Sequence, residues 1–135
     1  MKKKSRPFVW PVRVYYEDTD SGGVVYHSNY LNFMERARTE WLRALGFEQN
    51  RLAQESGLVF AITRMEVQFL APARLDDTLQ VSVTLVKQGQ ASLNLAQEIV
   101  RERDGRLLIQ ATARIAMLNR QFKPTRMPPA FLAAL

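Results

Sequence analysis

At 135 residues, the chain is long enough for one hydrophobic core but not for two. Its 47% hydrophobic and 24% charged residues exclude a disordered chain and are typical of a globular domain. The lack of cysteine excludes disulfide bonds, a thiol nucleophile and thiolate metal sites, and a single histidine excludes a multi-histidine zinc site. The net charge of +6 favours an anionic partner.

The beginning of the chain gives no sign of a membrane anchor or an export signal. No apolar run approaches the roughly 18 residues that a membrane-spanning helix requires. The basic start Met1–Lys4 is followed by Ser5, Arg6 and Pro7, which interrupt the apolar core that a signal peptide needs. We therefore expect a cytoplasmic protein with a single domain over residues 1–135, in which residues 1–8 form a flexible lead-in.

A first strand is predicted directly after the lead-in. Its apolar residues recur at every second position, at Trp10, Val12, Val14 and Tyr16. This alternation is typical of a strand with one buried face. Pro11 near its start favours an edge strand, because proline has no N–H to donate to a neighbour.

An acidic, glycine-containing loop and a long amphipathic helix follow. The apolar residues of the helix recur at spacings of three and four, which places them on one stripe: Tyr30, Met34, Ala37, Trp41 and Leu45. Ser28 or Asn29 can cap its beginning, and Gly46 is a typical stop. The sequence thus predicts one central helix that begins where the loop ends.

The rest of the chain predicts a short helix over 49–55 and four more strands. Their alternating apolar residues are Met65, Val67, Phe69 and Ala71, then Leu79, Val81, Val83 and Leu85, then Ala91, Leu93, Leu95 and Ile99, then Leu107, Ile109, Ala111, Ala113, Ile115 and Met117. Asp104-Gly105 is a strong hairpin signal between the last two. We expect the proline-containing tail, 120–135, on the surface. The pattern predicts an α+β fold in which an antiparallel sheet is covered by the helix.

Asp20 and His27 lie at the turn between the first strand and the helix. A carboxylate there can attack a carbonyl carbon or deprotonate a water that does so, and the N-terminal amides of the helix can stabilise an oxyanion. The plainer alternatives are that Asp20 forms a turn and that His27 makes a structural hydrogen bond. Asp18, two residues earlier, is expected to accept backbone hydrogen bonds and to order the loop.

Three more residues are candidates for binding a substrate. Gly23 permits a positive φ and a close approach of substrate to the backbone, although such glycines are equally common in loops without function. Tyr26 and Tyr30 can line a substrate channel, or they can simply pack along the helix. A metal bound by carboxylates alone is not excluded, but no group of carboxylates in the sequence suits one, so we predict no metal site.

Four short motifs run through this part of the chain. They are Tyr16-Glu17-Asp18-Thr19-Asp20, Gly22-Gly23-Val24-Val25-Tyr26-His27, Asn29-Tyr30 and Glu35-Arg36-Ala37-Arg38. Together they resemble the signature of hotdog-fold acyl-CoA thioesterases. The closest resemblance is to the YbgC-like branch associated with the Tol–Pal system, a relative of the 4-hydroxybenzoyl-CoA thioesterases. The similarity extends through 71–77 and weakens after about Leu118.

The resemblance implies a hotdog fold, in which an antiparallel sheet wraps around one long central helix. It also implies dimers whose sheets join edge to edge, with shared active sites and often a tetramer. The catalytic carboxylate of the family falls at Asp20, as nucleophile or general base, and a functional histidine of the YbgC-like branch falls at His27. The 4-hydroxybenzoyl branch has a tyrosine there, so the backbone N–H at this position is the feature common to both.

The function implied is hydrolysis of an acyl-CoA, or of the same acyl group on an acyl carrier protein, to a free acid and a thiol. A thioester is already activated, so the reaction requires no cofactor. Three alternatives remain open: a hotdog dehydratase, a non-catalytic module that binds acyl thioesters or an acyl carrier protein, and a basic nucleic-acid binder. The last lacks any recognised motif or interleaved aromatic and basic stripe.

Overall fold

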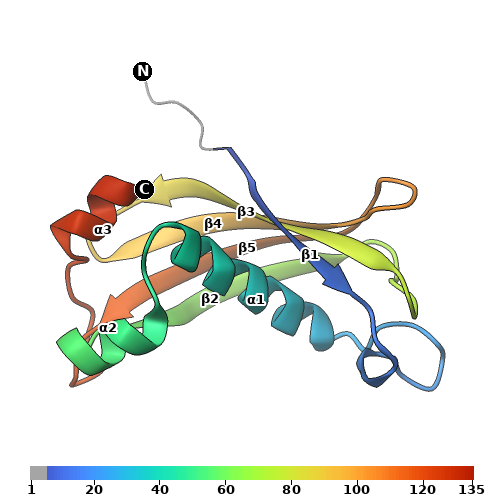
Figure 1. Ribbon diagram of the computed structural model, residues 1–135, viewed down its shortest axis with the longest axis horizontal. Coiled ribbons are helices and arrows are strands. Elements are labelled where there is room, and N and C mark those ends of the chain that lie inside the picture. Colours follow the sequence, from blue (N-terminus) through green and yellow to red (C-terminus); the bar gives the residue numbers. More distant parts are fainter. Residues whose placement is uncertain (1–5) are drawn as a thin grey trace.

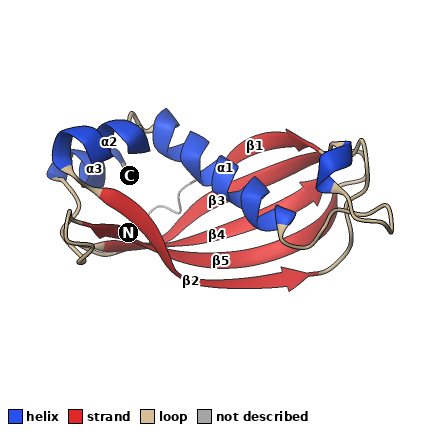
Figure 2. Ribbon diagram, turned by 90° about the horizontal axis from the view of Figure 1, so that it is seen from below, coloured by secondary structure: helices blue, strands red, loops and turns tan. Residues whose placement is uncertain are grey.

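The computed structural model describes residues 6–135, so most of the predicted lead-in lies outside the described residues. The elements are β1 (Phe8–Arg13), α1 (Asn29–Ala44), α2 (Gln49–Ser56), β2 (Val59–Phe69), β3 (Thr78–Gln88), β4 (Ser92–Arg101), β5 (Arg106–Leu118) and α3 (Pro129–Ala134). The five strands form one antiparallel sheet in the order β1-β3-β4-β5-β2, and α1 lies across one face (Figures 1 and 2). This arrangement confirms the predicted antiparallel sheet with a central helix.

The core lies between α1 and the face of the sheet that it covers. The predicted stripe is buried at Tyr30, Met34, Ala37 and Trp41, whereas Leu45 is only half-buried. The inward residues of the central strands are buried as the alternation predicts, and those with no exposed surface include Leu79, Val81, Leu95, Ile99 and Ile109. Alternation therefore identified the apolar face of each central strand.

The edges of the sheet differ in length. One edge is β1, with six residues and Pro11 near its middle, and the other is β2, with eleven residues. The β4–β5 hairpin forms at the predicted Asp104-Gly105 turn, where Gly105 has a φ of +68°. Within residues 6–135, no helix combines the length and apolar character needed to cross a membrane.

The first strand ends earlier than the alternation predicts. Val12 and Val14 are buried, but Trp10 is 37% exposed and Tyr16 is 82% exposed. The chain leaves the sheet after Arg13 and makes a single 3₁₀ turn, Tyr16–Asp18. The carboxylate of Asp18 accepts the backbone N–H of Tyr15 at 2.8 Å, and this local hydrogen bond replaces strand pairing.

The tail is also placed differently from the expectation. Met127 and Phe131 are buried in the core, and the ring of Phe131 packs against Phe47 and Phe60. The tail is attached through backbone hydrogen bonds from Thr125 to Met117 and from Met127 to Gln90. Residues 120–135 therefore close the end of the core beside α2, and only part of this segment is surface.

Candidate active site

The loop that precedes α1 carries most of the predicted site residues. It lies at one end of the sheet, and α2 and α3 lie at the opposite end (Figures 1 and 2). Backbone hydrogen bonds fold it back on itself: the N–H of Asp20 donates to the carbonyl of Val24 at 2.8 Å, and the N–H of Tyr26 donates to that of Asp18 at 2.9 Å. The loop is thus an ordered part of the structure.

Asp18 orders this loop, as its predicted role requires. Its side chain accepts the N–H of Tyr15 at 2.8 Å and the amide of Asn29 at 3.1 Å, and the residue is only 8% exposed. Asn29 is therefore engaged with the loop, and Ser28, at the cap position of α1, makes no capping hydrogen bond through its side chain. The predicted side-chain capping by Ser28 or Asn29 does not form: Ser28 has helical backbone angles (φ −73°, ψ −20°), and the Oδ1 of Asn29 accepts the side-chain amide of Asn32 at 3.3 Å.

Asp20 is exposed, in contrast to Asp18. Its Oδ1 accepts the backbone N–H of Gly22 at 2.8 Å, which fixes the side-chain direction through a local turn. Within residues 6–135, Oδ2 accepts no hydrogen bond and no ion pair reaches the carboxylate. One oxygen of an ordered carboxylate is therefore available to a water or a substrate.

His27 and Tyr26 form the exposed end of the same loop. Their rings pack against each other with centroids 4.4 Å apart. Among the described residues, no hydrogen bond or ion pair joins His27 to Asp20. The backbone N–H of His27 also donates to no acceptor in this part of the chain. Because α1 begins two residues later, this free N–H lies near the positive end of the helix dipole.

Tyr30 and Ala73 connect the site to a second loop, residues 70–77. Ala73 has no exposed surface, and both of its backbone polar groups contact the site: its N–H donates to the Tyr30 hydroxyl and its carbonyl accepts the N–H of Val25, each at 2.9 Å. Burial raises the pKa of Tyr30 above its ordinary 10.0, so the hydroxyl is protonated at neutral pH. Tyr30 also packs on Phe69, with ring centroids 5.9 Å apart.

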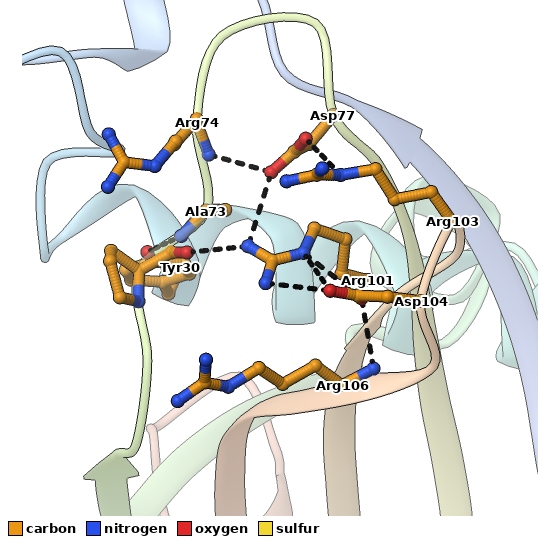
Figure 3. Close-up of polar contacts among 9 residues, drawn as sticks. Tyr30, Ala73, Arg74, Asp77, Arg101, Arg103, Asp104 and Arg106 are labelled. Atoms are coloured by element: carbon orange, nitrogen blue, oxygen red, sulfur yellow. Dashed lines mark hydrogen bonds and ion pairs between the residues drawn. The ribbon is translucent and has the colours of Figure 1, made fainter.

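A charge cluster with two buried members, Arg101 and Asp77, lies beside the second loop (Figure 3). Arg101, at the end of β4, is 7% exposed and donates to Asp104 through Nε at 3.1 Å and through Nη2 at 3.0 Å. Its Nη1 lies 3.8 Å from Asp77, which also lies 3.5 Å from Arg103. The hydrogen bond from Arg101 holds the pKa of Asp104 below its ordinary value.

None of the residues of this cluster was among the site residues predicted from the sequence. The alternation of residues along β4 nevertheless indicated two of its polar residues. Gln97 and Arg101 stand at the same alternate positions as Leu93, Leu95 and Ile99, so both had to point inward. A polar residue in a buried register needs a polar partner, and that requirement would have identified both.

Comparison with known proteins assigns the fold and the family. The model of the thioesterase-like superfamily matches residues 14–135. The acyl-CoA thioesterase YbgC of Haemophilus influenzae is 41% identical over 128 residues, which cover 94% of this chain and 93% of that protein. The chain belongs to the thioesterase-like superfamily.

Two further relatives agree with this assignment. The acyl-CoA thioester hydrolase YbgC of Escherichia coli O6:H1 is 43% identical over 127 residues, which cover 93% of each chain. The crystal structure of a probable thioesterase from Bartonella henselae is 36% identical, with a TM-score of 0.86 over 91% of this chain and all of that one. The predicted α+β hotdog fold and the resemblance to YbgC-like thioesterases are thereby confirmed.

The loop before α1 of this thioesterase-family chain carries four of the predicted site residues, all exposed: Asp20, Gly23, Tyr26 and His27. Tyr30 lies beneath them in the first turn of α1, as a buried residue. Among the described residues, no group of three or more histidine or acidic side chains is arranged to hold a metal ion.

Proposed function

We propose that this protein is a thioester hydrolase that converts an acyl-CoA and water to a free acid and CoA, with Asp20 as its catalytic carboxylate. Its YbgC relatives are named as acyl-CoA thioesterases, which supports the reaction. The observation that supports the site is local. An ordered carboxylate with one free oxygen lies on the same loop as the free N–H of His27.

These groups suffice for either of two mechanisms. As a general base, Asp20 takes a proton from water, and the hydroxide attacks the thioester carbonyl carbon. As a nucleophile, the carboxylate attacks the same carbon, and water then cleaves the resulting anhydride. In both, the N–H of His27 and the positive end of α1 stabilise the oxyanion, and the C–S bond breaks to release the sulfur as a thiolate. The thiolate takes the proton that Asp20 removed from water in the first route, and a proton from solvent in the second.

Gly23, Tyr26 and Tyr30 bind the substrate in this proposal. Gly23 has a φ of +80°, and a Cβ there would meet no atom within 4 Å, so the space beside its backbone is open. Tyr26 is exposed and can contact the acyl group or the pantetheine arm. Tyr30 is buried against Ala73, so its contribution is to hold the loop in place beneath the substrate.

The proposal includes a cytoplasmic homo-oligomer, with a dimer as its minimum unit and a tetramer as the solution state. The free edge of β2 can pair with the same strand of a second copy, because an unpaired edge offers a row of backbone donors and acceptors. The face of the sheet opposite α1 carries no helix of the described chain and has a hollow of about 790 Å³, which a second dimer can cover.

A thiol-release assay over a panel of acyl-CoAs tests the proposed reaction. We expect hydrolysis of at least one acyl-CoA by the wild-type protein, and the panel identifies the preferred acyl chain. The same acyl groups on an acyl carrier protein test the second substrate class. Binding of acyl-CoA without any thiol release would contradict the enzyme and favour a binding module.

A further inference from the structure

We propose that Arg101 is a positioning residue for the thioesterase reaction, which it serves by holding the loop that clamps the catalytic segment. The proposal rests on the proposed function for its activity measurements. The guanidinium lies between two separate segments: the β4–β5 turn, which it contacts at Asp104, and the 70–77 loop, which it contacts at Pro72 and Asp77.

The first step is electrostatic. A buried guanidinium is costly unless its charge is paired. Asp104 accepts from both Nε and Nη2, and Asp77, which is 8% exposed, lies 3.8 Å from Nη1. These two acids fix the plane and direction of the guanidinium, because its parallel Nε and Nη2 donors match the two oxygens of the Asp104 carboxylate. Arg101 is therefore a fixed donor at the base of the loop.

The second step is the hydrogen bond from this donor to the loop. Nη1 of Arg101 donates to the carbonyl of Pro72 at 3.1 Å. Ala73, the next residue, donates to the Tyr30 hydroxyl and accepts from Val25. The Pro72 carbonyl and the Ala73 N–H belong to one peptide group, and the Ala73 carbonyl belongs to the next. A shift of the Pro72 carbonyl would therefore move both contacts of Ala73.

The third step leads to Asp20. Val25 lies between Val24, whose carbonyl accepts the N–H of Asp20, and Tyr26, whose N–H donates to Asp18. Val24 also makes a bridge with Arg74 on the second loop. The position of the catalytic segment relative to α1 thus depends on Ala73, and through it on Arg101. A misplacement of about 1 Å at a reacting group can lower a rate by about 10²-fold.

If Arg101 only formed a structural ion pair, its hydrogen bond to the Pro72 carbonyl would not matter for the reaction. The variant Arg101→Lys distinguishes this alternative from a positioning role. Lysine keeps the charge but loses the fork, and it cannot serve Asp104 and the Pro72 carbonyl in the same geometry. We expect kcat to fall by about 10- to 100-fold while KM changes by less than about threefold. Exchange of the Val25 amide hydrogen should accelerate, because its acceptor on Ala73 is no longer held.

Two control variants define the comparison. Ile99→Val lies two residues earlier on β4 and removes a buried methylene but no hydrogen-bonding group, so it reports the effect of lost packing. Arg103→Gln removes an exposed cation from Asp77 and leaves Arg101 in place. We expect both to keep kcat near the wild-type value.

In Arg101→Ala, low concentrations of guanidinium should restore kcat, and sodium chloride at equal ionic strength should not.

The outcomes are distinct. The inference is overturned if Arg101→Lys keeps both kcat and Val25 amide protection, or if Ile99→Val loses as much kcat as Arg101→Lys does. If the wild-type protein hydrolyses no thioester, the proposed function fails instead. The amide-exchange comparison between wild type and Arg101→Lys then still decides whether Arg101 holds the catalytic segment.

Discussion

At the scale of single residues, two aspartates two positions apart have opposite environments. Asp18 is buried and accepts two hydrogen bonds, whereas Asp20 is exposed and keeps one oxygen free. Both are the same residue type in one acidic loop, so sequence position alone does not distinguish their roles. The difference in hydrogen bonding does, and it leads to separate predictions for the two.

Asp20→Asn should abolish most of the activity without unfolding the protein. The amide keeps an acceptor for the N–H of Gly22 but carries no charge for attack or proton abstraction. We expect kcat to fall by about 10²–10⁴-fold with an unchanged melting temperature and retained substrate binding. His27→Ala should lose less, because its backbone N–H remains. Activity of Asp20→Asn within about threefold of wild type would remove the catalytic role from this residue.

Asp18→Asn should affect stability more than chemistry. Tyr15 and Asn29 donate to different oxygens of the carboxylate, so the asparagine amide keeps an acceptor for one of them and turns its NH₂ group toward the other. Leaving one buried donor unpaired costs about 1–3 kcal/mol, which urea unfolding can measure. A stable but inactive Asp18→Asn, beside an active Asp20→Asn, would exchange the roles of the two residues.

At the scale of elements, one buried amide attaches α1 to the sheet. Gln97 on β4 is 1% exposed, donates to the carbonyls of Met34 and Ser82, and accepts from Arg38 at 2.8 Å. Because Met34 and Arg38 both belong to α1, Gln97 sets the position of the helix along the sheet. Apolar packing alone is less directional.

Gln97→Met should therefore destabilise the protein although methionine is more hydrophobic. Arg38 loses its hydrogen-bond acceptor, and a hydrogen bond to a charged group contributes about 2 kcal/mol. In the double variant with Arg38→Met, the loss should be smaller than the sum of the single losses, which a double-mutant cycle in urea measures. Strict additivity would show that the two side chains are not coupled.

The β4–β5 hairpin should carry part of the acid sensitivity of the fold. Arg101 lowers the pKa of Asp104 below its ordinary 3.8, so the folded state binds this proton less readily than the unfolded state does. The resulting stability is present above that ordinary value and is lost as the pH falls through the folded-state pKa. Asp104→Asn should be less stable than wild type near neutral pH, and this difference should shrink in urea titrations at about pH 3.

The sequence predicted the elements well where alternation or helical spacing had a single explanation. The helix over 49–55 was confirmed within one residue as α2, and the β4–β5 turn formed at the predicted position, whereas β2 ends at Phe69, two residues before the predicted Ala71. It failed where a side chain formed a local hydrogen bond instead, as Asp18 does at the end of the first strand. It also could not identify the contact of Arg101 with Pro72, since these residues meet only through the tertiary structure.

At the scale of the whole molecule, the positive charge should act on a substrate with phosphates. The chain carries a net charge of +6, and surface ion pairs weaken as salt screens them. We expect KM for an acyl-CoA to rise with ionic strength while kcat changes little. A pantetheine thioester without the nucleotide should bind more weakly at low salt. Equal KM values for the acyl-CoA and the pantetheine thioester would show that the positive charge does not bind the CoA phosphates.

The proposed assembly makes a prediction for the face opposite α1. Ala96 lies in the hollow on that face, so Ala96→Arg should block a second dimer without reaching the core. We expect light scattering to show four chains for wild type and two for the variant, while the exposed control Gln121→Arg leaves the mass unchanged. A wild-type mass near 15.5 kDa at micromolar concentration would contradict any oligomer.

The strand order also has a consequence for how the chain reaches its native state. Strands β3, β4 and β5 are consecutive hairpins, whereas Phe8 of β1 pairs with Val83, and Val59 of β2 pairs with Leu118. Contacts between distant residues form late because closing long loops costs entropy. The three-stranded meander should therefore form first, and the loop that carries Asp20 should reach its contact with Ala73 last. In a refolding experiment, recovery of thioesterase activity should lag behind recovery of the circular dichroism signal.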